Sequence, residues 1–367
     1  MRELRLINNA IERFKLDLAG LKVFTEAATG YFSWTAVIAA LAGAEQVFAL
    51  AKTSRYATAE EAGNTVLQLA KNCGVSDRIQ IVYEYALLGQ ADIVTNSGAV
   101  RPISVDLIQQ LKPGAVIPLM WETWEFRDTD LDLSACAKND VLVFGTNETH
   151  PDLRTFDFVG VLAAKLLFEA GLELFGNRIL VVGGGEFGAS VCRTLNAIGA
   201  TVGCIALKED QVTALTDYSI CETLGAKEAI SFLRKSDGII FAEHHKENLL
   251  IGEDGELNAA SLKELNPTLK LAHISGWVDV LDLNTSGFYT TPLHIVQKPR
   301  VMSVTTDYVG PKPVLELNVA GLKVGEEMAR ARRVHPNDLE SARKLALQHP
   351  FCSDFSSLQI KTYGLYQ

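Results

Sequence analysis

The sequence predicts an α/β protein with two Rossmann-like, doubly wound parallel-sheet domains that are joined by long crossing helices. Three observations support this fold class. Short apolar runs alternate with helical patterns along most of the chain. A Gly-x-Gly-x-x-Gly turn lies between one of these runs and a helical pattern. The chain has 367 residues, of which 48% are hydrophobic, so it can bury two cores of ordinary domain size.

The first half of the chain reads as alternating helices and strands, which is typical of a parallel sheet with helices on both faces. A helix is expected over residues 1–20, and helical patterns also cover 33–41 and 59–71. Residues 1–151 are therefore expected to form an N-terminal α/β domain that binds the substrate. The expected strands are 21–25, 47–50, 79–83, 91–96, 115–120 and 141–145.

The second half repeats this alternation around the glycine turn. A long amphipathic helix from residue 152 leads into the turn, and a helix at 312–333 is long enough to return to the first domain. We expect an NAD(P)-binding Rossmann domain at 152–325 and a C-terminal segment, 326–367, that packs on the first domain. The other expected elements are helices at 227–234 and 259–265 and strands at 236–245, 269–275 and near 301–304.

The glycine turn lies in residues 177–207, NRILVVGGGEFGASVCRTLNAIGATVGCIAL. Gly183 allows a tight turn, Gly185 lets the backbone approach a pyrophosphate, and Gly188 lets the helix pack closely on the strand. The first amides of the helix then face the phosphates with a partial positive charge. The pattern predicts dinucleotide binding. The alternative is a Rossmann unit that keeps its glycines for packing alone.

The choice between NAD and NADP depends on the end of the next strand. An acidic residue that binds the ribose is expected there, about 20 residues after the turn. The chain has Ala206, Leu207 and Lys208 at this point, which favours the 2′-phosphate of NADP, whereas Glu209 or Asp210 would serve NAD if the strand ends later. The residues expected to contact the NADP or NAD cofactor are Gly183, Gly185, Glu186, Phe187, Gly188, Lys208, Ser275 and Gly276.

Composition narrows the classes of partner. Acidic residues outnumber basic ones by 44 to 34, a net charge of −10, and no long Lys/Arg run is present, so a nucleic-acid partner is not expected. No segment has the 18 apolar residues of a membrane span, and the N-terminus lacks the apolar core of a signal peptide. We expect a cytoplasmic protein with no membrane partner. The six cysteines are scattered without metal-ligand spacing, so no metal is expected.

In the order of its segments, the first half resembles the class I S-adenosylmethionine-dependent methyltransferases. The resemblance covers about a hundred residues and includes VFTEAATG (23–30), GAEQVFAL (43–50), DRIQIV (77–82), ADIVTNS (91–97) and LIQQLKPGAVIPL (107–119). Glu26 is followed by a single glycine, Gly30, where the family has two or more. The acid that would bind the ribose is replaced by Ala51 and Lys52. The resemblance therefore implies a shared scaffold with a degenerate methyl-donor site.

The segment from residue 158 to about 325 resembles the cofactor-binding half of the D-isomer-specific 2-hydroxyacid dehydrogenases, the formate and glycerate dehydrogenase-like group. SDGIIFA (236–242), ASLKELNPTLKLAHIS (260–275) and VMSVTTDYVGPKPVLEL (301–317) occur in the family's order. The resemblance implies a Rossmann fold and a nicotinamide cofactor. The family's catalytic arginine, glutamate and histidine are absent, since their positions hold Ser275 or Gly276, a residue near Thr291, and Asp307. Without the arginine clamp and the proton-exchanging histidine, ordinary 2-hydroxyacid oxidation is not expected.

Other residues offer acid–base chemistry. Glu243, His244 and His245 follow a predicted strand at the edge where doubly wound sheets bind ligands, although the same residues would also suit a solvated loop. Asp307, Tyr308 and Lys312 occupy the region of the family's catalytic groups, and a lysine beside a tyrosine would lower the pKa of the phenol. The alternative is a simple helix entry.

Arg101 and Arg127 are candidates to bind an anionic substrate group, with Trp121 as a wall of the binding site. We therefore expect an NAD(P)-dependent oxidoreductase that transfers hydride to or from a small polar carbonyl or hydroxyl compound, with a homodimer implied by the dehydrogenase resemblance. One alternative is a group-transfer or lyase-type enzyme that uses S-adenosylmethionine or tightly bound NAD. The other is a non-catalytic dinucleotide-binding module.

Overall fold

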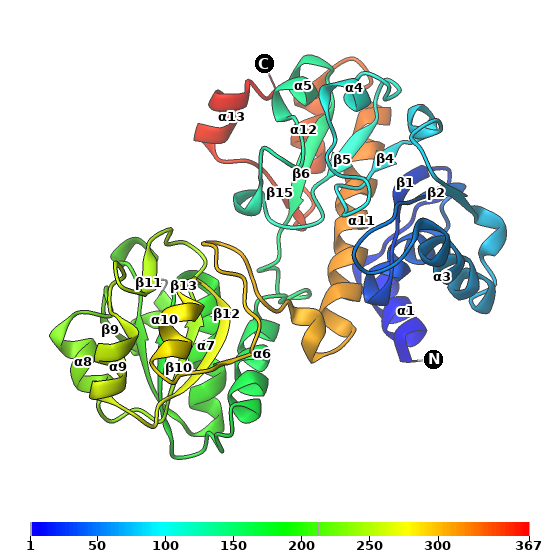
Figure 1. The fold of residues 1–367 in the computed structure, drawn as a ribbon. Helices are drawn as coiled ribbons and strands as arrows, with labels where there is room; N and C mark the ends of the chain where they lie inside the picture. The colour runs from blue at the N-terminus through cyan, green and yellow to red at the C-terminus, as the bar shows by residue number, and fades with distance from the viewer. Residues whose placement is uncertain (1, 211–212, 367) are drawn as a thin grey trace. The chain divides into compact units, whose positions relative to one another are not determined.

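The computed structural model describes residues 2–210 and 213–366, in which the chain forms two compact units (Figure 1). Unit 1 contains the residues up to Arg154 together with those from Pro311 onward, and unit 2 is Thr155–Gly310. The boundaries expected from sequence were 151/152 and 325/326. The second boundary differs because helix α11 (Lys312–Val334) packs along its whole length within unit 1.

Unit 1 contains a seven-stranded sheet in the order β15-β6-β5-β4-β1-β2-β3. The strands β1 to β6 are all parallel, and β15 pairs antiparallel with β6 at one edge. From β3 to β6 the order is 3-2-1-4-5-6, the order of a doubly wound Rossmann sheet. The strands are β1 (Lys22–Ala27), β2 (Gln46–Ala51), β3 (Ile79–Val82), β4 (Ile93–Val94), β5 (Val116–Pro118), β6 (Leu142–Thr146) and β15 (Cys352–Ser353).

Helices cover both faces of this sheet, because neighbouring residues of each strand point to opposite cores. Val23 of β1 packs in the core that α2 and α11 cover, whereas Phe24 packs in the core that α4 and α5 cover. The other helices are α1 (Arg2–Phe14), α2 (Trp34–Leu41), α3 (Ala59–Asn72), α4 (Val105–Ile108), α5 (Leu133–Lys138), α12 (Leu339–Ala346) and α13 (Ser357–Tyr363).

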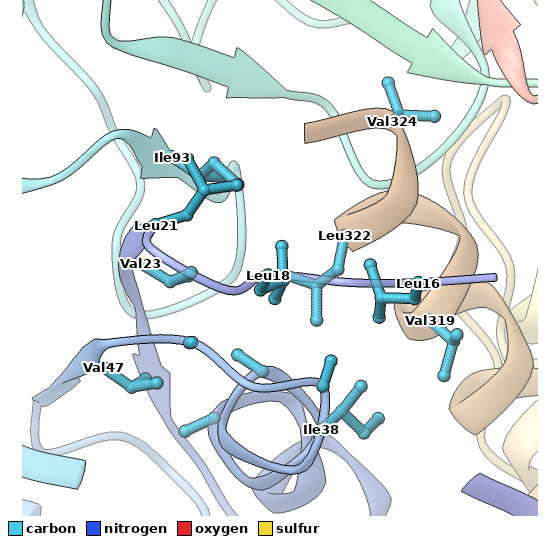
Figure 2. Close-up of a cluster of buried hydrophobic side chains, with 14 of the residues drawn as sticks. Leu16, Leu18, Leu21, Val23, Ile38, Val47, Ile93, Val319, Leu322 and Val324 are labelled. Atoms are coloured by element: carbon cyan, nitrogen blue, oxygen red, sulfur yellow. The ribbon is translucent and has the colours of Figure 1, made fainter. Parts of the chain in front are cut away.

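Helix α1 ends at Phe14, earlier than the expected residue 20. Lys15 has a positive φ of 54°, which interrupts the helix, and the chain then runs to β1 without a regular helix. Leu16 and Leu18 of this segment point into the core between α11 and α2 (Figure 2). The burial of these two leucines stabilises the irregular conformation, which local periodicity did not predict.

Unit 2 contains a six-stranded, fully parallel sheet in the order β14-β12-β10-β7-β8-β9. Read from β9, this is again the order 3-2-1-4-5-6, so the two-domain α/β fold class is confirmed. The strands are β7 (Arg178–Val182), β8 (Thr201–Ile205), β9 (Ser219–Cys221), β10 (Gly238–Ala242), β12 (Lys270–Ser275) and β14 (Thr290–Thr291). The expected strand near 301–304 is absent, and Met302 forms only an isolated antiparallel bridge with Ser275.

The sheet of unit 2 is also covered on both faces. Ile179 and Val181 of β7 pack against α6 and α7, whereas Leu180 and Val182 pack in the core that α8 and α9 cover. No helix among residues 2–210 and 213–366 is both long enough and apolar enough to span a membrane. The helices and remaining strands of unit 2 are α6 (Asp157–Glu169), α7 (Gly185–Ile198), α8 (Lys227–Leu233), α9 (Ala259–Leu265), α10 (Val280–Thr285), β11 (Leu249–Ile251) and β13 (Trp277–Val278).

Helix α11 lies close to the sheet of unit 1 through Gly325. A Cβ atom at this position would lie 2.8 Å from Cγ2 of Ile93 and 3.1 Å from Cγ of Pro118. We expect Gly325→Val to lower the free energy of unfolding by about 1–3 kcal/mol, because the added methyl groups overpack this contact. Urea denaturation measures the change. Val334→Ile, which adds a methylene at a 63% exposed position of the same helix, is the control and should change stability by less than about 0.5 kcal/mol. Equal stability of the two variants would contradict the close packing.

Candidate functional site

The glycine turn of unit 2 lies at the carboxyl edge of its sheet, where the strand order reverses between β7 and β10. Gly183 has a φ of 143°, and a Cβ atom there would lie 2.2 Å from the carbonyl oxygen of Ala242, at the end of β10. A Cβ atom on Gly188 would lie 2.0 Å from the carbonyl oxygen of Gly183. A side chain at either position would separate the turn from β10 or from α7. These two glycines therefore have a demonstrable packing role.

The same turn presents backbone amides at the start of α7. Gly188 donates the first helical hydrogen bond, to the carbonyl oxygen of Gly184 at 2.9 Å. The amides of Gly185, Glu186 and Phe187 precede this bond, and amides in this position are the ones that bind phosphate oxygens. The turn thus combines close backbone packing with an amide-lined helix N-terminus at the edge where doubly wound sheets bind ligands.

His245 covers the turn on its exposed side. Its Nε2 atom lies 2.6 Å from where a Cβ atom of Gly185 would be, and its Nδ1 atom lies 3.7 Å from Oδ1 of Asp210. The Asp210 carboxylate lies on the Nδ1 side of the ring, and Nε2 faces Gly185 of the turn. Lys208, the residue expected to select NADP, is exposed nearby in the sequence, and the side chain of Glu209 lies outside what the structure describes.

A buried polar group lies beside the turn, at the ends of β10 and β12. Oε1 of Glu243 accepts hydrogen bonds from the amides of His245 and Lys246, at 2.7 and 2.9 Å. Its Oε2 atom accepts none from the described residues, and neither does Oγ of Ser275, although both residues are almost fully buried. Gly276 packs against Glu243, since a Cβ atom there would lie 3.3 Å from that of Glu243. Buried polar atoms without partners are rare in proteins, so these two mark a place where a ligand would satisfy them.

His244 is held by aromatic stacking. Its ring stacks on Phe187 at a centroid distance of 4.7 Å and an interplanar angle of 29°. Phe187 is 5% exposed and contacts Phe156 just before α6, at 5.7 Å. The side chain of Phe187 therefore positions His244, and only its backbone amide is available for a cofactor.

His273 supports the same edge from within β12. It is fully buried, with Nε2 2.8 Å from the carbonyl oxygen of Gly276 and Nδ1 3.1 Å from Oγ of Ser303. Since the carbonyl can only accept, Nε2 carries the proton and Nδ1 accepts from Ser303. Burial lowers the pKa of His273 to about 4, so the ring is neutral and fixes the turn at Gly276.

Of the expected group Asp307, Tyr308 and Lys312, the first two belong to unit 2, and the structure places them away from this edge. The Tyr308 hydroxyl donates to the carboxylate of Glu169, the last residue of α6, and Lys165 lies over the Tyr308 ring at 3.8 Å. The glycine turn lies at the other end of α6, as the contact between Phe156 and Phe187 shows. The pKa of Tyr308 is raised by this carboxylate, the opposite of the direction expected from a lysine neighbour.

The other two members of that group have local partners. The carboxylate of Asp307 accepts a hydrogen bond from the Thr305 hydroxyl at the start of a short 3₁₀ helix, Thr306–Val309. Lys312 belongs to unit 1, where its Nζ atom lies 3.7 Å from the carboxylate of Glu316. Tyr308 and Lys312 thus have separate carboxylate partners, and neither Tyr308 nor Asp307 joins the histidines at the carboxyl edge.

In unit 1 the structure brings together two of the three expected substrate-binding residues. Arg101 lies over the Trp121 ring at 4.7 Å and pairs with Asp130 at 2.8 Å. Arg127 is exposed, and its charge lowers the pKa of Glu125, a residue that the sequence patterns did not identify. Burial raises the pKa of Glu125 to about 7, aided by the charge of Glu122 and opposed by that of Arg127. The sequence feature that could have identified Glu125 is the second acidic residue of WETWEFR, which follows a strand.

In the part of the chain that the structure describes, no three His, Cys, Asp or Glu side chains are grouped to hold a metal.

Comparison with known proteins finds similarity at the level of structure only. No protein-family model and no curated protein matches this sequence. A dipicolinate synthase component from Bacillus halodurans matches with a TM-score of 0.51 and 12% identity over 86% of this chain and 98% of that chain. A 2-hydroxyacid dehydrogenase from Ketogulonicigenium vulgare matches with a TM-score of 0.48 and 16% identity, over 86% and 96% of the two chains. D-lactate dehydrogenase from Lactobacillus jensenii, solved with NAD+, gives 0.48 and 13%, over 86% and 97%.

The structures similar to this chain include 2-hydroxyacid dehydrogenases, the group that the second half of the sequence resembles. At 12% identity, the match with the dipicolinate synthase component shows the fold alone.

Because His273 is neutral in the folded chain, we predict how the free energy of unfolding depends on pH. Its pKa is about 4 in the folded chain against 6.5 ordinarily, so below pH 6.5 the unfolded chain binds more protons than the folded one. We expect the free energy of unfolding to fall by up to about 3 kcal/mol as the pH falls from 6.5 to 4, the value of a shift of this size. Denaturant titrations across this range measure the slope. His273→Gln should flatten it, whereas His294→Gln, at an exposed position, should not. An unchanged slope in His273→Gln would contradict the assignment.

Proposed function

We propose that the chain is an NAD(P)-dependent oxidoreductase that transfers hydride to or from a small polar carbonyl or hydroxyl compound. One observation carries this proposal: the glycine turn, with amides at the start of α7, lies at the strand-order reversal of a doubly wound sheet. The combination is typical of dinucleotide sites. The buried atoms without partners, Oε2 of Glu243 and Oγ of Ser275, add support because they lie on neighbouring strand ends of that sheet.

The order of strands predicts where each part of the dinucleotide would bind. The pyrophosphate would accept hydrogen bonds from the amides of Gly185, Glu186 and Phe187, with Nε2 of His245 facing the same position. The adenosine end would lie towards the end of β8, near Lys208 and Asp210. The nicotinamide end would lie on the other side of the turn, towards β10 and β12.

The groups on the nicotinamide side suit proton handling and positioning. The bound nicotinamide supplies or accepts the hydride. His244 is the candidate acid–base group, because its imidazole is held against Phe187 at the end of β10. Glu243 and Ser275 offer buried oxygen atoms to the amide or hydroxyl groups of a ligand. His245, oriented by Asp210, is the second candidate for proton transfer and also faces the phosphate position.

Recognition of the substrate is assigned to unit 1. The position of the arginine that the dehydrogenase group uses holds Ser275 or Gly276 in this sequence, so we propose that another cation binds an anionic substrate group. Arg101 is the best placed, because stacking on Trp121 and pairing with Asp130 fix its guanidinium plane. Arg127 is a second, more mobile candidate on the exposed surface. We also propose a homodimer, on the resemblance to two-domain dehydrogenases.

The first test is the titration of Gly185→Ala with NADH and NADPH by calorimetry. We expect the wild-type chain to bind one of them and the variant to lose at least tenfold in affinity, because Gly185 has a φ of 57° and a Cβ atom there meets the His245 ring. Gly171→Ala is the matched control. It places alanine at a φ of 89° with no other atom within 4 Å, so the backbone strain is similar but the turn is untouched.

Equal affinities in the two variants, or no binding of either nucleotide by the wild-type chain, would overturn the dinucleotide site. A chain that binds nucleotide but oxidises no NAD(P)H with a panel of small oxo acids, aldehydes and ketones would be a non-catalytic binding module instead.

The preference between the two nucleotides gives a second prediction. We expect Lys208→Glu to reduce NADPH affinity about tenfold relative to NADH, because the substitution replaces a cation that would pair with the 2′-phosphate by an anion that repels it. Competition titrations of both nucleotides measure the ratio. Lys227→Glu, at the start of α8, makes the same charge change elsewhere in unit 2 and should leave the ratio unchanged. A ratio unaffected by Lys208→Glu would show that this lysine does not select the cofactor.

A further inference from the structure

The sheet of unit 1 has its own strand-order reversal, between β1 and β4, and polar side chains gather at its carboxyl edge. The register pairs Phe24 with Val94, so the next residues, Thr25 and Thr95, are also neighbours. Their hydroxyl groups are hydrogen-bonded at 2.7 Å, and Oγ of Ser97 lies 2.9 Å from that of Thr95. One residue further on each strand come Glu26 and Asn96. Doubly wound sheets bind ligands at this position, and nothing in the proposed dinucleotide site uses it.

Glu26 is a buried carboxylate with one oxygen unused. The residue is 6% exposed, and its Oε2 atom accepts a hydrogen bond from the amide of Ala99 at 3.0 Å. Oε1 accepts no hydrogen bond from any described residue. Burial raises the pKa of the carboxyl group, against the opposing effects of the Ala99 amide and the Arg101 charge. A glutamine would accept the Ala99 hydrogen bond equally well without the cost of burying a charge, so the loop does not require the acid.

The side chain of Asn96 is a second buried polar group at this edge that lacks a hydrogen-bond partner among the described residues. It is 1% exposed, and Oδ1 of its side chain accepts no hydrogen bond from the described residues. Its backbone amide does bond, to the carbonyl oxygen of Pro118 at 3.1 Å, so the residue is well fixed in the sheet edge. A buried side-chain amide is ordinarily hydrogen-bonded. Asn96 follows β4 and Glu26 belongs to the neighbouring strand β1, so both lie at the edge where a ligand would supply the missing partner.

Arg101 provides the opposite charge at the same edge. Its Nη1 atom pairs with Asp130, whereas no described residue accepts a hydrogen bond from Nε or Nη2. The side chain is 26% exposed, and its guanidinium carbon lies over the Trp121 ring at 4.7 Å. Its guanidinium group is close enough to Glu26 to lower the pKa of that carboxyl group. The edge thus has three groups without hydrogen-bond partners among the described residues: one carboxylate oxygen of Glu26, the side-chain amide of Asn96, and Nε and Nη2 of Arg101.

The balance of charge selects among ligands. Glu26 and Asp130 are two carboxylates against the single guanidinium of Arg101, which leaves one negative charge in excess. A ligand with only carboxylates would add repulsion to this excess. A ligand with an ammonium group offsets the Glu26 charge, and a carboxylate on the same molecule can pair with Arg101.

We propose that Glu26, Asn96 and Arg101 bind an α-amino acid in unit 1, with the ammonium group on Glu26 and the carboxylate on Arg101. The side-chain amide of Asn96 donates to the carboxylate and accepts from the ammonium group. The same three residues exclude 2-hydroxy acids, because these lack the cation that the buried Glu26 requires.

This inference rests on the proposed function where it names the reaction. Oxidation of such an amino acid by NAD(P)+ would break its Cα–H bond, with the hydride going to the nicotinamide and one proton going from the nitrogen to water. The C–N bond becomes C=N, which gives an imino acid, NAD(P)H and a proton. Addition of water then releases a 2-oxo acid and ammonium.

The test is calorimetric titration of the full chain, without nucleotide, with each of the common α-amino acids. We expect saturable binding of at least one. Its 2-hydroxy acid analogue and its decarboxylated amine should each bind at least tenfold more weakly. Glu26→Gln and Arg101→Gln should each lose at least tenfold in affinity for the amino acid. Glu26→Gln should keep or raise the melting temperature, since glutamine still accepts from Ala99.

Glu122→Gln is the matched control, because Glu122 is a buried glutamate of the same unit whose two oxygens accept from the amide of Glu148 and the hydroxyl of Ser353. This variant should bind the amino acid as the wild-type chain does. The inference is overturned if no amino acid binds, if the 2-hydroxy acid binds equally well, or if Glu26→Gln leaves the affinity unchanged. Saturable binding of S-adenosylmethionine alone would also overturn it. Because no nucleotide is present, failure of the dinucleotide site leaves this result interpretable.

Discussion

The close approach of the glycine turn to the end of β10 is the contact on which the site in unit 2 depends. Gly183 lies so near the Ala242 carbonyl oxygen that no side chain fits between them. This contact fixes the start of α7 and holds Glu243, His244 and His245 beside its amides. A parallel sheet brings all its strand ends to one edge, but only this approach makes the turn and the polar loop adjacent.

The two units share one strand order and use its edge differently. In unit 2 the edge combines backbone amides with a neutral His273 and with Glu243, one oxygen of which accepts hydrogen bonds from two amides. In unit 1 the edge carries charged side chains, Glu26 and Arg101, whose partners within the chain leave part of each unused. An amide-lined edge suits phosphate, and a mixed-charge edge suits a small zwitterion. The same topology therefore supports two kinds of recognition.

The missing dehydrogenase trio has a structural counterpart. Gly276 has a φ of 115°, and a Cβ atom there would lie 2.9 Å from Cδ1 of Leu250, so an arginine at this position would be strained. His273 further fixes the turn by its bond to the Gly276 carbonyl.

The sequence by itself determined the alternation of strands and helices, the glycine turn, and helices such as α9, because these depend on local periodicity and on the conformations that glycine and capping residues allow. It did not determine the short strands β9, β14 and β15, whose two or three residues carry no periodic signal and form only through pairing with a longer neighbour. Nor did it determine side-chain partners: the Tyr308 hydroxyl bonds to Glu169 and Lys165 lies over its ring, whereas Lys312 pairs with Glu316. Those neighbours come from strand register and helix packing between residues far apart in the chain. Tertiary structure alone therefore decided which of the candidate residues meet.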